Sequence, residues 1–216
     1  MTQHAPKPSP IHDGVKIGHV HLKVADIDRA LTFYCDVLGF HITQRYGDSA
    51  VFIAAGDYHH HIGLNTWESK GGSPPPQGST GLYHTAILYP TRPSLADALR
   101  RVMAAGIPLD GASDHGVSEA LYLRDPDQNG VELYWDKPRE LWPVDAKGHL
   151  QMYSKRLDLD NLLTEPAPEK PTESDIKNQR MRLQALSRWE NEGGALPEAN
   201  LSETNPEKIH PYNQGN

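Results

Sequence analysis

The stretch "IGHVHLKVADIDRALTFYCDVLGF", residues 17–40, predicts a strand that leads directly into a helix. Its first residues alternate between apolar and polar, which is the two-residue period of a strand with one buried face. Asp26 then offers a helix N-cap, apolar residues recur at helical spacing from Ile27 to Leu38, and Gly39 supplies the stop. The stretch therefore predicts the beginning of a mixed α+β unit.

This unit is expected to occur twice. Short apolar runs separated by Gly and Asp predict three more strands, so residues 16–67 should form a βαβββ module. A loop rich in Gly, Pro and Ser follows over residues 68–82, and the same order of elements returns over residues 83–137. In this second module Ser94 is the expected helix cap, and "DPDQNG" is the expected turn of a hairpin. The sequence thus predicts an α+β fold in which two modules form a half-open barrel.

The two ends of the chain differ from the modules in composition. Residues 1–15 are a Pro-rich lead, and residues 138–216 are expected to form an irregular C-terminal extension with one candidate helix near Ile176. The first part of the extension has enough apolar residues to pack on another surface, whereas the acidic, Pro-rich part after it is typical of a linker. We expect the extension to complete an oligomer interface or to cover the cleft, and the protein to be a homo-oligomer.

Charge and composition narrow the class of function. The 216 residues have a formal net charge of -7, which disfavours nucleic acid as a partner because phosphate recognition needs clustered Lys and Arg. No run approaches the about 20 apolar residues that span a bilayer, so no membrane partner is expected. The single cysteine, Cys35, and an N-terminus without a signal-peptide pattern are typical of a reducing compartment, and a cytoplasmic location is expected.

Aligning the two modules with each other identifies a candidate metal site. His19 aligns with His84 on the first strands, whereas His21 has no histidine equivalent. On the last strands, Gly63 aligns with Glu132. If both sheets line one cleft, His19, His84 and Glu132 supply two imidazoles and a carboxylate, which is the facial arrangement of non-haem Fe(II) oxygenases. Mn(II) suits the same ligands and is the alternative metal.

Each candidate also has an ordinary structural explanation. A single strand histidine is usually a surface or satisfied core residue, and a strand glutamate such as Glu132 usually points to solvent. The three histidines at residues 59–61 fit an exposed strand entrance, and Tyr122 fits a half-buried aromatic of the sheet. The equivalent positions of His19 and His84 in the repeat favour the metal site over these explanations.

The stretches "IGHVHLKVADIDRALTFYCDVLGF", "DYHHHIGLNTW", "GLYHTAILYP" and "DHGVSEALYLRDPDQNGVELYWD" resemble the vicinal oxygen chelate superfamily, most closely its extradiol catechol 2,3-dioxygenases. The resemblance covers residues 16–155, and the order and spacing of the motifs make it specific. It implies that His19, His84 and Glu132 are the metal ligands. It further implies that Fe(II) is the cofactor and that a catechol-type aromatic and O2 are the substrates.

The resemblance also implies three catalytic residues. The acid–base histidine of the family aligns with His60, although strand alternation alone would place His61, on the face of Gly63, toward the cleft. Following the resemblance therefore implies irregular pairing at the strand entrance. A histidine and a tyrosine that contact the catecholate and oxygen align with His115, across a short gap, and with Tyr122. Gly63 is expected to leave room on the metal for substrate and O2.

Two other functions share this fold class. A glyoxalase-like isomerase resembles a four-ligand site with a carboxylate from each module, but Gly63 stands where the second carboxylate would be. A drug-binding protein of the bleomycin-resistance kind would need no metal ligands. Many similar extradiol enzymes carry four modules, whereas two are expected here. The sequence favours an extradiol dioxygenase that inserts both atoms of O2 into a catechol-type aromatic at an Fe(II) site.

Overall fold

A computed structural model of the protein describes residues 9–168 and Met181. The chain divides into two compact units, residues 1–168 and residues 169–216, and the strands of the described residues all belong to the first. The segment near Ile176, for which the sequence predicts a helix, lies outside the described residues. In the described part of the chain, no helix combines the length and the apolar character that crossing a membrane requires.

The first module contains a four-stranded sheet and one helical segment. Its elements in chain order are β1 (Val20–Lys23), α1 (Ile27–Leu31), the π-helical η1 (Thr32–Val37), β2 (His41–Tyr46), β3 (Ala50–Ala54) and β4 (Ile62–Asn65). The strand order is β1-β4-β3-β2, with β1 parallel to β4 and the other neighbours antiparallel. Helix α1 begins at the predicted cap, because the Asp26 carboxylate accepts a hydrogen bond from the Arg29 amide at 2.8 Å.

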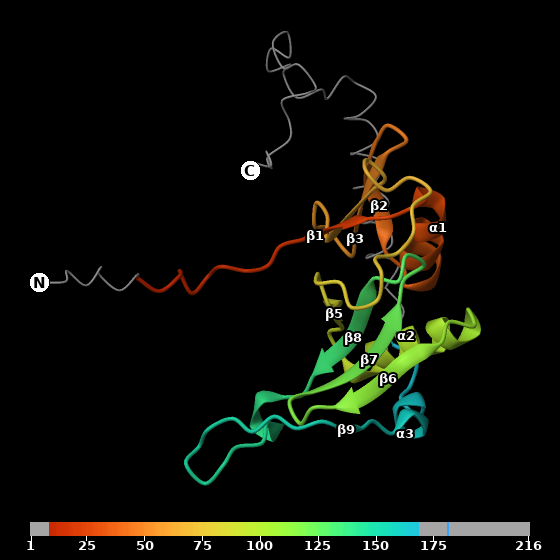
Figure 1. Cartoon of the computed structure of the whole chain (residues 1–216). Helices are drawn as coiled ribbons and strands as arrows, with labels where there is room; N and C mark the ends of the chain where they lie inside the picture. Colours follow the sequence, from red (N-terminus) through yellow and green to blue (C-terminus); the bar gives the residue numbers. More distant parts are fainter. Residues whose placement is uncertain (1–8, 169–180, 182–216) are drawn as a thin grey trace, which may run out of the picture. The chain divides into compact units, whose positions relative to one another are not determined.

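The second module repeats this arrangement (Figure 1). Its elements are β5 (Thr85–Leu88), α2 (Arg92–Ala104), β6 (Leu109–Asp114), β7 (Ser118–Arg124) and β8 (Gly130–Asp136). The strand order β5-β8-β7-β6 corresponds strand by strand to that of the first sheet, and β5 is again parallel to the last strand of its module. The predicted βαβββ repeat and the predicted hairpin between β7 and β8 are therefore confirmed.

The predicted N-cap of the second helix is wrong. Thr91 is the cap, because its hydroxyl oxygen accepts a hydrogen bond from the Ser94 amide at 3.2 Å. Ser94 therefore lies in the first turn of α2, directly after Pro93. Proline suits the start of a helix because the amide hydrogen that it lacks would have no partner within the helix there. The predicted stop at Gly106 is correct, since this residue adopts a positive φ of 68° directly after the helix.

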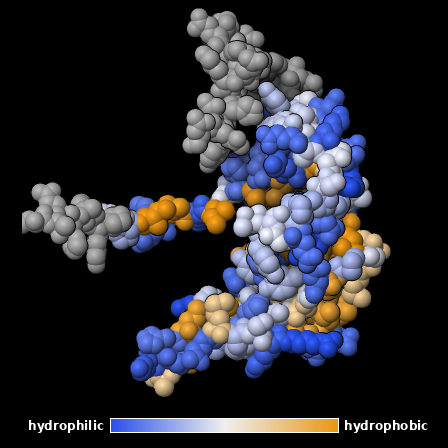
Figure 2. Space-filling view, in the orientation of Figure 1, coloured by the Kyte–Doolittle hydropathy of each residue, from blue (hydrophilic) through white to orange (hydrophobic). Residues whose placement is uncertain are grey.

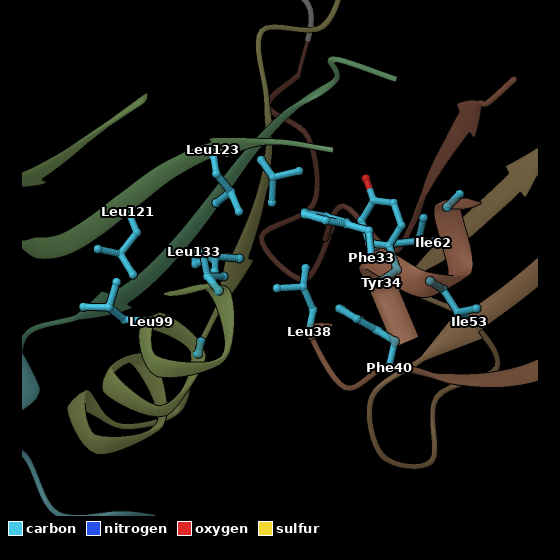
Figure 3. Packing of buried hydrophobic residues seen from close by; sticks show 14 of the residues in the cluster. Phe33, Tyr34, Leu38, Phe40, Ile53, Ile62, Leu99, Leu121, Leu123 and Leu133 are labelled. Atoms are coloured by element: carbon cyan, nitrogen blue, oxygen red, sulfur yellow. The ribbon is translucent and has the colours of Figure 1, made fainter. Parts of the chain in front are cut away.

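Buried side chains of the two modules belong to one hydrophobic cluster. Figure 3 shows that aromatic and aliphatic residues of the first module face leucines of the second, namely Phe33, Tyr34, Leu38 and Phe40 opposite Leu99, Leu121, Leu123 and Leu133. Full burial of one such side chain stabilises a fold by about 1.5–3 kcal/mol. The shared cluster therefore fixes the two modules against each other.

Buried polar contacts reinforce the packing of the modules. The Tyr34 hydroxyl donates a hydrogen bond to the Asp125 carboxylate at 3.0 Å, and both residues are 1% exposed. Arg29 of α1 forms an ion pair with Asp127 at 2.6 Å, and the Ala25 amide donates to the same carboxylate. Asp125 also accepts hydrogen bonds from amides within its own hairpin turn. The turn between β7 and β8 is therefore tied to the first module.

The C-terminal extension packs on the second module as far as residue 165. Arg92 of α2 forms ion pairs with Glu119 at 2.7 Å and with Glu165 at 2.6 Å. Leu157 and Leu162 are buried in the shared cluster, so the apolar residues of this part pack on the modules. Its elements are the 3-10 turn η2 (Arg139–Leu141), β9 (Lys155–Arg156), which pairs with β6, and α3 (Leu159–Leu163).

Both sheets are open rather than closed into a barrel. Each sheet buries one face in the shared cluster and turns the other away from it. In the second sheet, Leu121 and Leu133 point into the core, so Tyr122 and Glu132, their direct neighbours in the sequence, lie on the opposite face. In β1, Leu22 is buried whereas His21 is exposed. The candidate functional residues therefore lie on two separate sheet faces.

Candidate metal centre

His84 and Glu132 form a close pair on the second sheet. Strands β5 and β8 are parallel, with Ala86 opposite Glu132, so His84 reaches the same face from the residue just before β5. The His84 Nε2 atom lies 2.8 Å from the Glu132 Oε2 atom, and the two side chains are 31% and 12% exposed. Gly130 permits this approach, because a Cβ at this position would collide with the Tyr83 carbonyl oxygen. The pair is open to solvent on one side.

Tyr122 and His115 extend this pair into a hydrogen-bonded network. Tyr122 is the cross-strand partner of Glu132, and its hydroxyl donates to the Glu132 Oε1 atom at 3.2 Å. The same hydroxyl lies 2.7 Å from His115 Nε2, while His115 Nδ1 lies 3.1 Å from the Tyr153 carbonyl oxygen. Because a carbonyl only accepts, His115 Nδ1 carries the proton in this bond. Burial, and then the negative charge of Glu132, raise the pKa of Tyr122 to about 12.

The remaining predicted residues lie together on the first module. The His19 and His60 rings have centroids 4.4 Å apart, and His59 Nδ1 lies 2.7 Å from His60 Nδ1. Burial lowers the pKa of His60, and the neighbouring imidazoles of His19 and His59 lower it further. His61 instead packs its ring against Tyr58, with centroids 4.7 Å apart. Of the three consecutive histidines, His59 and His60 therefore lie beside His19.

The strand pairing beside these histidines is irregular at the entrance of β4, as the resemblance to the family implies. β3 and β4 pair in regular register from Ile53 opposite Ile62 onward, but the His61 amide also donates to the Ile53 carbonyl oxygen at 2.9 Å, so both His61 and Ile62 lie opposite Ile53. His60 precedes the strand, which begins at Ile62, so its side chain does not follow the strand alternation. A second irregularity of this sheet lies between Ile42 and Gln44 in β2.

The His21 ring fills the space beside Gly63, although His21 has no histidine equivalent in the second module. A Cβ at Gly63 would lie 2.8 Å from the His21 ring, so the glycine accommodates this imidazole rather than leaving open room for substrate and O2. His21 shares its face of β1 with His19, and its ring lies 5.3 Å from that of Trp67. Burial and the charge of His19 lower the pKa of His21. The strand alternation of "HVHLK" is the signal that could have identified His21.

The donors within one chain do not complete the predicted metal site. The separation of His84 Nε2 and Glu132 Oε2 fits two ligands on one metal, since ligand atoms at about 2.1 Å from a metal lie about 3 Å apart at a right angle. His19, the third predicted ligand, is in contact with the histidines of its own module. Over residues 9–168, no group of three or more His, Cys, Asp or Glu side chains is placed to hold a metal ion.

A family model of known proteins matches residues 16–133, which is the whole of the repeat up to β8, and its description is Glyoxalase/Bleomycin resistance protein/Dioxygenase superfamily. The chain belongs to this superfamily. Its two open sheets and few helices are the fold that the superfamily resemblance predicted.

Relatives within the superfamily include dioxygenases. The chain is 40% identical to catechol-2,3-dioxygenase of Bacillus subtilis over 163 residues, which cover 75% of this chain and 56% of that protein. It is 32% identical to biphenyl-2,3-diol 1,2-dioxygenase 2 of Rhodococcus globerulus over 121 residues, which cover 56% of this chain and 63% of that protein. The chain thus spans little more than half the length of these relatives.

A solved structure agrees with the fold. A glyoxalase/dioxygenase from Nostoc punctiforme superposes with a TM-score of 0.50 at 21% sequence identity. The superposition covers 61% of this chain and 99% of the other. This likeness concerns the arrangement of strands and helices alone.

Proposed function

We propose that the protein is an extradiol ring-cleaving dioxygenase that inserts both atoms of O2 into a catechol-type aromatic. The proposed metal ligands are His19, His84 and Glu132, with Fe(II) as the metal and Mn(II) as the alternative. The observation that carries the proposal is the His84–Glu132 pair at 2.8 Å with the Tyr122 hydroxyl directly beside it. In this reaction one ring C–C bond breaks and both oxygen atoms stay in the product, so no external reductant is needed.

The side chains of the network are suited to hold a catechol and to move its protons. A pKa of about 12 keeps the Tyr122 hydroxyl protonated at neutral pH, so its one hydrogen can turn from Glu132 to a bound substrate oxygen. His115 fixes the direction of this hydroxyl through its Nε2 atom. The lowered pKa of His60 keeps its imidazole neutral, and a neutral imidazole can accept the proton of a catechol hydroxyl.

The proposed test is reconstitution with Fe(II) under anaerobic conditions, followed by O2 uptake with a panel of substituted catechols and hydroquinones. We expect uptake of one O2 per substrate consumed and the appearance of a yellow ring-opened product. Stoichiometric metal without O2 uptake on any member of the panel would contradict the proposal and favour a glyoxalase-like isomerase. Protein that binds these aromatics but retains no Fe or Mn would favour a binding protein.

Three alanine variants test the assigned roles. His84→Ala should lose the metal, whereas His60→Ala should retain it and lose most of the turnover. His61→Ala is the matched control, since its ring packs on Tyr58, and it should retain both. Equal metal loss in the His60 and His84 variants would refute the separation of roles, and loss of turnover in the His61 variant alone would reassign the proton acceptor.

A further inference from the structure

A hairpin of the C-terminal extension lies against the turn that carries His115. The hairpin, residues 143–153, is closed where the Gln151 amide donates to the Pro143 carbonyl oxygen at 2.8 Å. Its tip, residues 146–150, is exposed, and Figure 2 shows the hairpin at the lower left with a mostly hydrophilic surface. Contacts at its base, rather than burial of its tip, therefore hold the hairpin in place.

The base of the hairpin encloses Gly116, which follows His115 in the turn between β6 and β7. Gly116 adopts a positive φ of 80°, and a Cβ at this residue would lie 2.7 Å from the Tyr153 ring and 2.8 Å from Pro143 Cγ. Both legs of the hairpin therefore pack on a position that suits glycine alone. A cation–π contact of Lys155 Nζ, 4.4 Å from the ring centre of Tyr153, links the same ring to β9.

Two hydrogen bonds join Tyr153 directly to His115. The Tyr153 amide donates to the His115 carbonyl oxygen at 3.2 Å, and the Tyr153 carbonyl oxygen lies 3.1 Å from His115 Nδ1. Because a carbonyl can only accept, this second bond requires a proton on Nδ1. His115 Nε2 then faces the Tyr122 hydroxyl oxygen at 2.7 Å, and that hydroxyl lies 3.2 Å from Glu132 Oε1. A continuous series of contacts therefore runs from the extension to the candidate metal site.

The backbone of the turn is held independently of the hairpin. Lys137, directly after β8, forms an ion pair with Asp114 at 2.7 Å, and its amide donates to the Val117 carbonyl oxygen at 2.8 Å. The same Asp114 oxygen accepts a hydrogen bond from the Gly116 amide at 2.8 Å. Loss of the hairpin contacts should therefore free the His115 ring without unfolding the turn.

We propose that the C-terminal extension is part of the candidate site, with Tyr153 as a positioning residue that holds the His115 ring and, through it, the Tyr122 hydroxyl. The use of that hydroxyl in turnover rests on the proposed function. A histidine on a turn could otherwise adopt several rotamers and carry its proton on either nitrogen. The Tyr153 carbonyl removes this choice and keeps Nε2 directed at Tyr122. This role differs from the oligomer interface or cover that the sequence predicts for the extension.

The first test follows the His115 proton by NMR in isotope-labelled, full-length protein treated with a chelator. The wild-type spectrum should contain an imidazole signal with the proton on Nδ1, protected from exchange with water, and His115→Gln identifies this signal by its loss. Tyr153→Gly removes the ring from Gly116 and gives the backbone more freedom, so the signal should disappear or divide between both nitrogens. Tyr153→Phe retains the ring and the backbone contacts, and it should rescue the signal.

A matched pair of glycine variants approaches the same contact from the turn. In Gly116→Ala the added methyl group would collide with the Tyr153 ring, so this variant should also weaken the His115 signal. Gly148→Ala is the control, because Gly148 has a nearly equal φ of 81° and, in the described part of the chain, its added Cβ would meet nothing within 4 Å. Equal loss of the signal in both alanine variants, or an unchanged signal in Tyr153→Gly, would overturn the inference.

The second test measures turnover after loading with Fe(II). Tyr153→Gly should retain the metal and the KM but lower kcat by about a hundredfold, the loss that a misplacement of about 1 Å can cause. In a Tyr122→Phe background the same substitution should cause no further loss, because the hydroxyl that Tyr153 positions is absent. A loss of the same factor in both backgrounds would indicate a merely structural effect and would overturn the inference.

The NMR measurement separates this inference from the proposed function. If the His115 signal responds as expected but no catechol supports O2 uptake, the positioning by Tyr153 stands and the dioxygenase proposal fails. If catechols are cleaved but Tyr153→Gly matches the wild-type protein in both the signal and kcat, the dioxygenase proposal stands and the positioning by Tyr153 fails.

Discussion

Replacing Tyr34 with phenylalanine should test how strongly the two modules are held together. Tyr34 is 1% exposed, and its hydroxyl donates at 3.0 Å to the equally buried Asp125 carboxylate. A hydrogen bond to a charged group contributes about 1.5–3 kcal/mol. After the substitution, the same Asp125 oxygen would still accept a hydrogen bond from the Asn129 side-chain amide at 2.9 Å. We therefore expect the lower half of that range, a loss of about 1.5–2 kcal/mol in the free energy of unfolding.

The loss can be measured by urea unfolding at pH 7, followed by tryptophan fluorescence. The slope of the transition should stay unchanged, because the substitution removes one oxygen without altering the surface that unfolding exposes. Tyr46→Phe is the control, since Tyr46 is 67% exposed and its change should stay within about 0.5 kcal/mol. A loss below about 0.5 kcal/mol for Tyr34→Phe would show that the buried contact does not stabilise the joined modules.

Three further predictions concern the candidate site. Gly130→Ala places a methyl group against the Tyr83 carbonyl and 3.0 Å from the His84 Cβ atom, so it should displace the start of β5 and weaken metal retention, measured by metal analysis after dialysis. Tyr122→Phe should retain the metal but lower turnover by about a hundred- to a thousandfold, the range for removing one positioned donor. Unchanged turnover would exclude a role for the hydroxyl. The pKa of His60 lies below its ordinary value of 6.5 in the folded protein, so the unfolded chain binds the proton more readily. The contribution of neutral His60 to the free energy of unfolding should therefore be full above pH 6.5 and decrease as the pH falls below it. His60→Gln should reduce this loss between pH 7.5 and pH 5.5 in urea titrations.

Much of the fold follows from local patterns in the sequence. Strand alternation, the helical spacing after Asp26 and the turn residues of "DPDQNG" act over a few residues, so they predicted the elements in their order. The misplaced cap at Ser94 is also a local matter, since Thr91 offers the same hydroxyl chemistry three residues earlier and Pro93 favours the first turn. The two-residue strand β9 is too short to show a period.

The assembly of the site depends on contacts that are distant in the sequence. The repeat predicts that His19 and His84 occupy equivalent strand positions, and the structure places each near one end of its own sheet. The shared core decides which faces of the two modules meet. Nothing in the sequence around Leu38 or Leu133 indicates that the two side chains belong to the same cluster. The position of the His21 ring over Gly63 likewise depends on pairing between β1 and β4. The sequence could therefore predict which candidate residues lie on each sheet, but not how far apart the two groups lie.

The pairing of β9 with β6 has a consequence for how shortened chains would behave. β6 is the outer strand of its βαβββ module, and Lys155 and Arg156 occupy part of its free hydrogen-bonding edge. An uncovered strand edge is a template on which other chains can add, and natural proteins cover or charge such edges to stay dispersed. A chain cut before residue 155 would present bare amides and carbonyls at this edge. Self-association of such a fragment would then result from the uncovered edge of β6. The role of the extension is therefore better tested by substituting Arg92, which pairs with Glu165, than by deleting residues.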